Sequence, residues 1–199
     1  MLIVLGLIAA LALFVVVWLP GVGLLARSGQ SRERRHRALV EDALKYLHAA
    51  ELRGAPATLE SLAGHLRLRV APTLDLVAEM EARGLIRTTG AGLTLTSSGQ
   101  EIAVRVIRAH RLLERYLADE LQMPLEAIHV AADRREHTVT PEDAAALDAR
   151  LGYPRHDPHG DPIPRADGQL AAVEAIALTD QPIGQAVGDF RHFWAGATD

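Results

Sequence analysis

The sequence of 199 residues contains no cysteine. This absence excludes disulfide bonds and thiolate metal ligands, so a metal site in this chain would have to use imidazole and carboxylate groups. A strong positive balance is also missing, because the formal net charge is −4. Binding to nucleic acid would therefore depend on local basic patches. The chain has no HExxH motif, no obvious nucleophile and no glycine-rich cofactor loop, and we therefore expect that it is not an enzyme.

Charged side chains are absent from residues 1–26, and this apolar run is long enough to cross a bilayer core of about 30 Å as a helix. No basic residue precedes the run and no clear cleavage site follows it, which favours a transmembrane helix over a signal peptide. Residues 27–37 hold five arginines and one glutamate and are expected to form a basic juxtamembrane linker. The positive-inside rule then predicts a single-pass protein of the cytoplasmic membrane with its soluble part in the cytoplasm. The same arginines could bind lipid headgroups or DNA phosphate.

Residues 38–98 have the pattern of a winged helix-turn-helix. Apolar spacing predicts a helix over 38–52, Thr58 is a suitable N-cap for a helix over 59–66, and a further helix is expected from about Pro72 to Arg83. Two short strands joined by a glycine turn follow over 85–96. Three helices and a hairpin in this order are typical of that fold.

Three more helices are predicted over residues 99–164. A capping box at Ser97–Glu101 begins a long helix that ends near Glu120, a second helix covers 126–137, and a third begins at Pro141 after the N-cap Thr140. An irregular loop rich in Pro, Asp and His follows over 153–165. We expect residues 165–199 to form a tail that is too short to bury a core of its own.

Imidazole and carboxylate groups gather on two of these helices. His110 and Glu114 are one turn apart on the first, and His129, Asp133, Glu136 and His137 share one side of the second. Two such helices lying side by side could surround a divalent ion of borderline character, such as Mn²⁺, Fe²⁺, Zn²⁺ or Co²⁺. The alternative is a solvated polar face. His156 and His159 in the loop are better explained by turn chemistry than by metal ligation.

Several motifs, in the same order, resemble the iron- and manganese-dependent repressors of the diphtheria toxin repressor family. They are Ala109-His-Arg-Leu-Leu-Glu-Arg115, the spacing of the histidines and carboxylates from His129 to His137, and the loop His156-Asp-Pro-His-Gly-Asp-Pro-Ile-Pro164. The resemblance implies a mainly α fold with a small β wing, in which the winged helix-turn-helix (38–98) precedes a helical metal-binding and dimerisation domain (99–164). The predicted N-terminal transmembrane helix is an addition to the family's pattern, and the tail is expected to be either a fragment of the family's SH3-like domain or disordered.

The resemblance also implies a ligand set. One metal position would use His110, Glu114 and His129, and the other would use Asp133, Glu136 and His137 with Asp42 from the first helix. Oxygen donors at Asp42 and Asp133 resemble the manganese-type members and favour Mn²⁺ or Fe²⁺ over Zn²⁺ or Co²⁺. The number of ions per protomer stays open, because Lys45 stands where manganese-type members tend to have a second carboxylate.

The family is also expected to bind double-stranded DNA as a homodimer. In this chain Arg67, Arg69, Thr73 and Arg87 are the candidate DNA contacts. The recognition helix departs from the family's pattern, since Glu79 and Glu81 add negative charge that phosphate would repel.

Two hypotheses of function follow. The first is a membrane-anchored, Mn²⁺- or Fe²⁺-dependent transcriptional regulator that represses genes of metal homeostasis. The alternative is a membrane-tethered sensor of divalent metal, or an accessory subunit of a metal transporter, whose degenerate winged helix does not bind DNA. A metalloenzyme is a third and weaker possibility, since histidine and glutamate can also activate metal-bound water.

Overall fold

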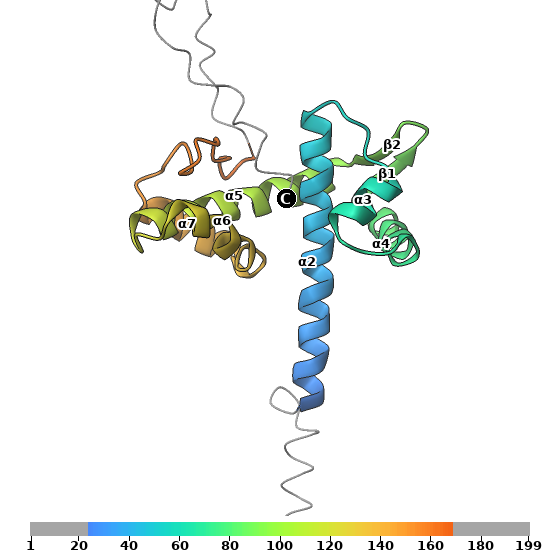
Figure 1. Ribbon diagram of the computed structural model, residues 1–199, viewed down its shortest axis with the longest axis horizontal. Coiled ribbons are helices and arrows are strands. Elements are labelled where there is room, and N and C mark those ends of the chain that lie inside the picture. Colours follow the sequence, from blue (N-terminus) through green and yellow to red (C-terminus); the bar gives the residue numbers. More distant parts are fainter. Residues whose placement is uncertain (1–23, 169–199) are drawn as a thin grey trace, which may run out of the picture. The chain divides into compact units, whose positions relative to one another are not determined.

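The computed structural model describes residues 24–168 and divides the chain between Ala103 and Val104 into two compact units (Figure 1). The N-terminal unit contains the helices α2 (Leu24–Leu52), α3 (Leu59–His65) and α4 (Val70–Ala82) and an antiparallel pair of strands, β1 (Ile86–Thr89) and β2 (Gly92–Leu95). Helix α5 (Ser97–Asp119) begins in this unit and continues into the next. The C-terminal unit also contains α6 (Leu125–Asp133), the short 3₁₀ helix η1 (Glu136–Thr138) and α7 (Pro141–Arg150).

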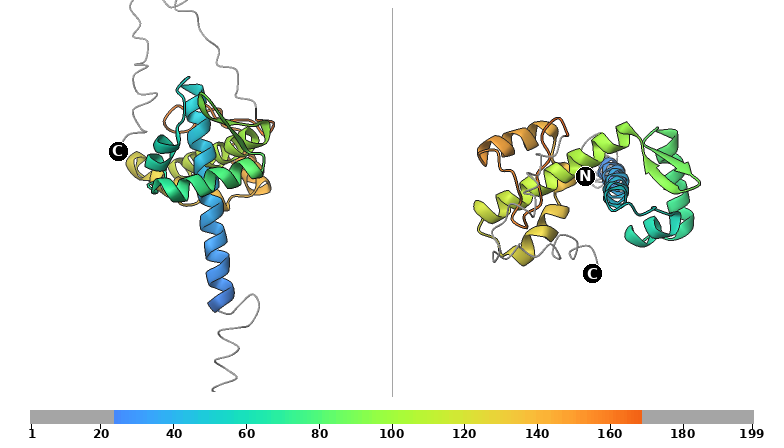
Figure 2. Two further views of the ribbon diagram at one scale, coloured as in Figure 1. Left: turned by 90° about the vertical axis from the view of Figure 1, so that its right-hand side faces the viewer. Right: turned by 90° about the horizontal axis from the view of Figure 1, so that it is seen from above.

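Helix α2 is longer than the helix predicted over 38–52. Its core-facing residues Val40, Ala43, Leu44 and Leu47 follow helical spacing and are buried against α3, α4 and the hairpin. The preceding residues 27–37, predicted as a linker, continue the same helix, and those from 29 to 37 are exposed. The left view in Figure 2 shows this half of α2 extending beyond the rest of the N-terminal unit.

The short helices begin where local capping predicts. The Thr58 hydroxyl oxygen accepts a hydrogen bond from the Ser61 backbone N–H, and the Ser61 hydroxyl oxygen accepts one from the Thr58 backbone N–H, so this reciprocal pair starts α3. Helix α4 begins at Val70, two residues before the predicted start at Pro72, and buries Leu76, Val77 and Met80.

The hairpin leads directly into α5. Ile86 pairs with Leu95, and Thr89 pairs with Gly92 across the turn. The hydroxyl of Thr96 then caps α5 by accepting from the Gly99 N–H at 3.2 Å, so the cap precedes the predicted capping box at Ser97. A Cβ on Gly99 would lie 2.0 Å from the Leu85 carbonyl oxygen, and glycine is therefore required for the approach of α5 to the hairpin.

The C-terminal unit has two small apolar clusters on α5. Leu112 packs with Ala144 of α7 and Ile163 of the following loop, and Leu117 packs with Ile128 and Ala132 of α6. The helix predicted over 126–137 is wrong in its last four residues, because α6 ends at Asp133, and Glu136 and His137 lie in η1. Thr140 caps α7 through a reciprocal pair of hydrogen bonds with Asp143, as its sequence predicts.

The predicted transmembrane helix requires a correction. Within residues 24–168, no helix combines the length and the apolar composition that crossing a membrane requires. Residues 1–23 of the predicted span lie outside the described residues, and residues 24–26 begin α2, whose many charged side chains would be costly to place in a bilayer. The membrane-spanning component of the predicted fold class is therefore wrong, and so is the predicted single-pass localisation at the cytoplasmic membrane. Of the predicted tail, residues 169–199 also lie outside the described part.

Candidate metal centre

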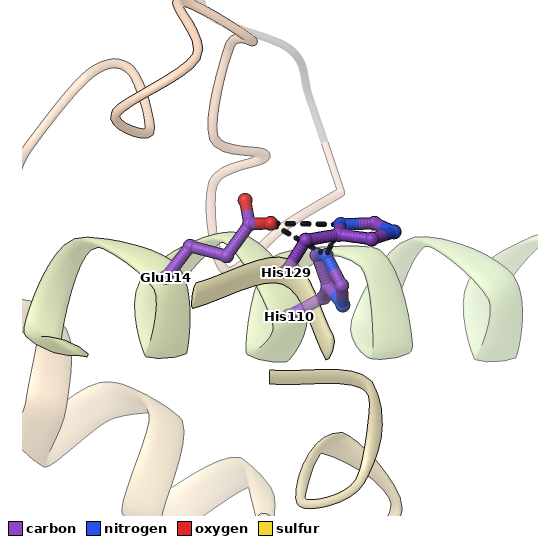
Figure 3. Close-up of side chains that lie close together, drawn as sticks. All are labelled: His110, Glu114 and His129. Carbon is purple, nitrogen blue, oxygen red and sulfur yellow. Dashed lines mark hydrogen bonds and ion pairs between the residues drawn. The ribbon is translucent and has the colours of Figure 1, made fainter. Parts of the chain in front are cut away.

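Two turns of α5 and one turn of α6 place three predicted ligands together (Figure 3). His110 and Glu114 are four residues apart on α5 and therefore lie on one face of the helix. Both side chains are buried, and His129 reaches them from α6, which is held against α5 by Leu117 and Ile128. The apolar packing of the two helices thus fixes the distance between the polar groups.

The potential ligand atoms of these three residues form a nearly equilateral triangle. His110 Nε2 lies 3.0 Å from Glu114 Oε1 and 3.1 Å from His129 Nδ1, and His129 Nδ1 lies 2.9 Å from Glu114 Oε1. Metal–ligand bonds of about 2.1 Å at right angles would place neighbouring ligand atoms about 3.0 Å apart. The triangle therefore has the dimensions of one face of an octahedral coordination sphere.

The ionisation of Glu114 suits this arrangement. Burial opposes its ionisation, but hydrogen bonds with His110 and His129 outweigh that effect and hold the pKa of Glu114 well below its usual range. The hydrogen bond to Glu114 in turn raises the pKa of His129. The centre therefore consists of an ionised carboxylate opposite two imidazoles. A divalent cation can bind to such a group by displacing the protons that these side chains share.

The other nitrogen of His110 faces a second group of carboxylates. His110 Nδ1 donates to Glu136 Oε2 at 2.5 Å and lies 3.3 Å from Asp133 Oδ1. A neutral imidazole carries a proton on only one nitrogen. Donation from Nδ1 to Glu136 therefore leaves a lone pair on Nε2, which points at the oxygen of Glu114 only 3.0 Å away. The hydrogen bond from His110 that lowers the pKa of Glu114 therefore requires a second proton on the imidazole, at Nε2, and a cation bound to Nε2 and Glu114 can replace that proton.

The loop after α7 brings two further groups that the sequence analysis did not assign to the site. One ligand atom each from Glu114, Asp157 and His159 lie within 4.8 Å of one another, and His159 Nδ1 is 3.6 Å from Glu114 Oε2. Burial, together with the nearby carboxylates Glu114 and Asp161, raises the pKa of Asp157 to about 6 against the hydrogen bonds that it accepts. The turn chemistry predicted for this loop is present, since Asp157 Oδ1 accepts from the backbone N–H groups of His159 and Asp161. Asp157 and His159 thus form the turn and also lie close to the metal ligand Glu114.

The remaining predicted ligands are placed as follows. His137 Nε2 lies 3.6 Å from Glu136 Oε1, and His129 Nε2 lies 4.0 Å from Asp133 Oδ2, so both residues border the second group. Asp42 belongs to α2 in the N-terminal unit, and its role as a ligand stays a prediction. His156 is exposed and its backbone pairs with Pro162.

The predicted DNA contacts divide into two groups. Arg67, Arg69 and Arg87 are exposed on the N-terminal unit, on either side of α4 in the sequence. Thr73 is fully buried and its hydroxyl donates to the Arg69 carbonyl at 3.0 Å. The structure therefore places Thr73 in the core of the unit and not on a surface that DNA could reach.

Comparisons with known proteins agree with this fold and these residues. Residues 96–165 match the family described as "Iron dependent repressor, metal binding and dimerisation domain". The chain is 35% identical over 138 residues to the iron-dependent repressor IdeR of Mycobacterium leprae, a match that covers 61% of this chain and 60% of that protein.

Solved structures give the same result. A manganese-dependent transcriptional repressor in complex with manganese is 34% identical, with a TM-score of 0.59, and the match covers 66% of this chain and 61% of that chain. The crystal structure of ScaR with bound Cd²⁺ is 30% identical, with a TM-score of 0.61, and here the match covers 72% of this chain and 68% of that chain.

The chain therefore belongs to the family of iron- and manganese-dependent repressors, as its motifs suggested. It spans about 60% of the length of the curated relative described above. The relatives are named as repressors, which agrees with the expectation that this chain is not an enzyme. Their names mention iron and manganese, the two metals expected from the oxygen donors, and one structure holds Cd²⁺.

Proposed function

We propose that this chain is a DNA-binding transcriptional repressor whose affinity for DNA depends on Mn²⁺ or Fe²⁺, and that it acts as a homodimer. The observation that carries the proposal is the triangle of His110 Nε2, Glu114 Oε1 and His129 Nδ1, with sides of 2.9 to 3.1 Å and no thiolate. Nitrogen and oxygen donors in this number suit Mn²⁺ and Fe²⁺, and they also permit Zn²⁺ and Co²⁺. The names of the relatives support both the metals and the repressor function.

We assign the ligands to two positions. His110, Glu114 and His129 form the first, and Asp157 and His159 lie beside it on the loop. Asp133, Glu136 and His137, together with Asp42 of α2, form the second. Because neutral His110 can offer a lone pair at only one nitrogen, the first position uses Nε2 while Nδ1 donates to Glu136.

A bound cation would supply positive charge at the point where the buried carboxylate and the imidazoles converge. In the protein, helix α5 connects the metal ligands with the winged helix. α5 starts in the N-terminal unit, after the hairpin of the winged helix, and carries His110 and Glu114 in the C-terminal unit. Drawing α5, α6 and the loop together orders the unit that carries the predicted dimer interface. The dimer then presents two winged helices to two DNA half-sites with a fixed spacing.

The test is a titration of the full-length protein with Mn²⁺, with Fe²⁺ under anaerobic conditions, and with Zn²⁺, followed by calorimetry. The same samples are mixed with a duplex from immediately upstream of the coding sequence, and anisotropy is recorded. We expect metal to tighten binding to DNA, and by linkage DNA should tighten metal binding by the same factor. Glu114→Gln should remove both the effect of metal on DNA binding and the effect of DNA on metal binding. Glu120→Gln should leave both effects unchanged, because Glu120 is exposed and follows directly after the end of α5. Metal binding without any effect on DNA would contradict the proposal.

One observation favours a second candidate, a metal sensor that does not bind DNA. The outer surface of α4 is apolar and acidic, with Val70 and Leu74 about half exposed and Glu81 also exposed. Such a surface suits a protein partner better than phosphate. The anisotropy experiment separates the two candidates, because the sensor would bind metal with unchanged ligands and show no affinity for the duplex.

A further inference from the structure

The exposed half of α2 carries a dense group of positive charges. We call residues 29–37 the basic extension. It contains Arg32, Arg34, Arg35 and Arg37 against one acidic residue, Glu33, and all of these side chains are exposed. The buried part of α2 begins only at Val40, so the packing of the N-terminal unit does not require the extension. Figure 1 shows it as the lower, blue part of the long helix.

The basic extension lies beside α4. His36 Nε2 makes a contact of 2.7 to 2.9 Å with the carboxylate of Glu79, which is on α4. This contact joins two residues that are far apart in the sequence, and it brings the segment of α2 around His36 against α4, the helix that would enter the major groove in a winged helix-turn-helix. The extension is thus part of the surface surrounding the recognition helix.

The recognition helix itself is poor in positive charge. Its exposed or partly exposed charged residues are Asp75, Glu79, Glu81 and, at its C-cap, Arg83, and the guanidinium of Arg83 donates to Glu79 at 3.2 Å. Affinity for DNA comes mainly from lysine and arginine side chains that neutralise phosphates. A DNA-binding unit with an acidic recognition helix needs lysine or arginine side chains on neighbouring elements. Among the described residues, the basic extension has the densest group of arginines.

The composition of the extension favours phosphate of a nucleic acid over a membrane surface. A helix that lies in a lipid interface needs an apolar face. Residues 27–37 contain no apolar side chain, and at 100° per residue the four arginines point to different sides of the helix. Like charges three residues apart, such as Arg32 with Arg35 and Arg34 with Arg37, also repel each other. A polyanion on more than one side of the helix relieves this repulsion.

We propose that the basic extension of α2 binds the phosphate backbone of duplex DNA beside the recognition helix. This inference rests on the proposed function for the nature of the partner, and it adds the surface that provides most of the electrostatic affinity. Phosphate contacts of this kind are independent of base sequence, so they should also be present on non-specific DNA and without metal.

The experiment compares three full-length proteins. The first is the wild type, and the second is the triple variant Arg34→Gln, Arg35→Gln, Arg37→Gln, in which glutamine keeps a high helix propensity. The third is a control that loses the same number of positive charges from exposed positions of the C-terminal unit, by Arg105→Gln, Arg155→Gln and Arg165→Gln. Binding to a short duplex of arbitrary sequence is measured by anisotropy between about 50 and 200 mM salt, the range in which counterion release is readily measured. The assay is run with and without Mn²⁺.

We expect the slope of log affinity against log salt concentration to be smaller by about 2.7 in the triple variant, at about 0.9 for each lost phosphate contact. The ratio of wild-type to variant affinity should therefore shrink by about 40-fold across that range. The control should keep the wild-type slope, which separates a local contact from an effect of net charge. Unchanged folding is checked by circular dichroism and by the affinity for Mn²⁺.

Equal slopes for the triple variant and the control would overturn the inference, and so would a wild type that does not bind the duplex at the lowest salt concentration. Anionic and neutral vesicles provide a further arm: a variant that loses binding to anionic vesicles but keeps the wild-type slope on DNA would assign the extension to lipid headgroups. The repressor proposal fails by a different result, namely that Mn²⁺ does not tighten binding of the wild type to its upstream duplex.

Discussion

Replacing Glu136 by glutamine is expected to weaken Mn²⁺ binding without removing it. The Glu136 side chain is buried, at 2% exposure, and its Oε2 accepts from His110 Nδ1 at 2.5 Å. That hydrogen bond keeps the proton of His110 on Nδ1 and turns Nε2 towards Glu114 and His129. Glutamine has the same shape but no charge, so it would hold the imidazole less firmly and make it a weaker base.

For the ion at the first position, the magnitude follows from the place of Glu136 behind the ligand His110, whereas at the second position Glu136 is itself a proposed ligand. Loss of such an orienting partner typically costs 10- to 100-fold in metal affinity, which is about 1.4 to 2.8 kcal/mol. Because the carboxylate is also a buried acceptor for a charge-assisted hydrogen bond, the metal-free protein should lose about 1.5 to 3 kcal/mol of its free energy of unfolding. Both losses come from one contact and should appear together.

Calorimetric titration with Mn²⁺ measures the first loss, and urea denaturation without metal measures the second. Glu120→Gln serves as the matched control, because Glu120 is exposed and forms a surface ion pair with Arg150, so it should change stability by less than about 1 kcal/mol and metal affinity not at all. Wild-type affinity in a folded Glu136→Gln protein would refute the reasoning. Loss of binding as complete as in Glu114→Gln would show that Glu136 is itself a ligand of the ion at His110.

Three further changes test the packing and the loop. Leu112→Ala removes a fully buried side chain from the cluster with Ala144 and Ile163, and urea denaturation should show a loss of about 2 to 5 kcal/mol. Gly99→Ala places a Cβ 2.0 Å from the Leu85 carbonyl oxygen, so the protein should lose at least about 1 kcal/mol or fail to fold, whereas the same change at Gly64, where a Cβ meets no atom within 4 Å, should not destabilise it. His159→Ala should reduce affinity for Mn²⁺ by about tenfold or more if the imidazole acts beside Glu114, and an unchanged calorimetric affinity would limit His159 to the turn.

Local sequence signals were sufficient for most helices. Thr58 and Thr140 were identified as N-caps from their own residue type and the apolar pattern that follows, and the structure confirms both caps. Similarly, the close pair His110 and Glu114 follows from helical spacing alone. These features depend on residues within one or two turns of each other, and a sequence shows such relations directly.

Features that depend on distant residues were not predictable in this way. No glycine or proline marks the end of α6, yet the helix stops at Asp133 and the chain tightens into η1, where Glu136 reaches His110 on α5. The loop residues Asp157 and His159 are held close to Glu114 by contacts with α5: Arg111 donates to the Pro162 carbonyl and faces Asp157 and Asp161, and Leu112 packs against Ile163. The predicted turn was correct, but the position of that turn in the unit depends on side chains from another helix.

Thr73 shows that a motif match can be overruled by the phase of a helix. The match of Pro72-Thr73 to the family's recognition helix suggested a base or phosphate contact. However, Thr73, Leu76, Val77 and Met80 have the spacing i, i+3, i+4 and i+7, which defines one face of a helix, and the last three are apolar. That face has to be buried because it carries the core residues of α4, so Thr73 is buried with it and satisfies its hydroxyl on the Arg69 carbonyl. The exposed residues of α4 are set by the same phase and are Val70, Ala71, Pro72, Leu74, Asp75, Ala78, Glu81 and Ala82. Any DNA contact from this unit must therefore begin from those residues and from the arginines on the elements around them.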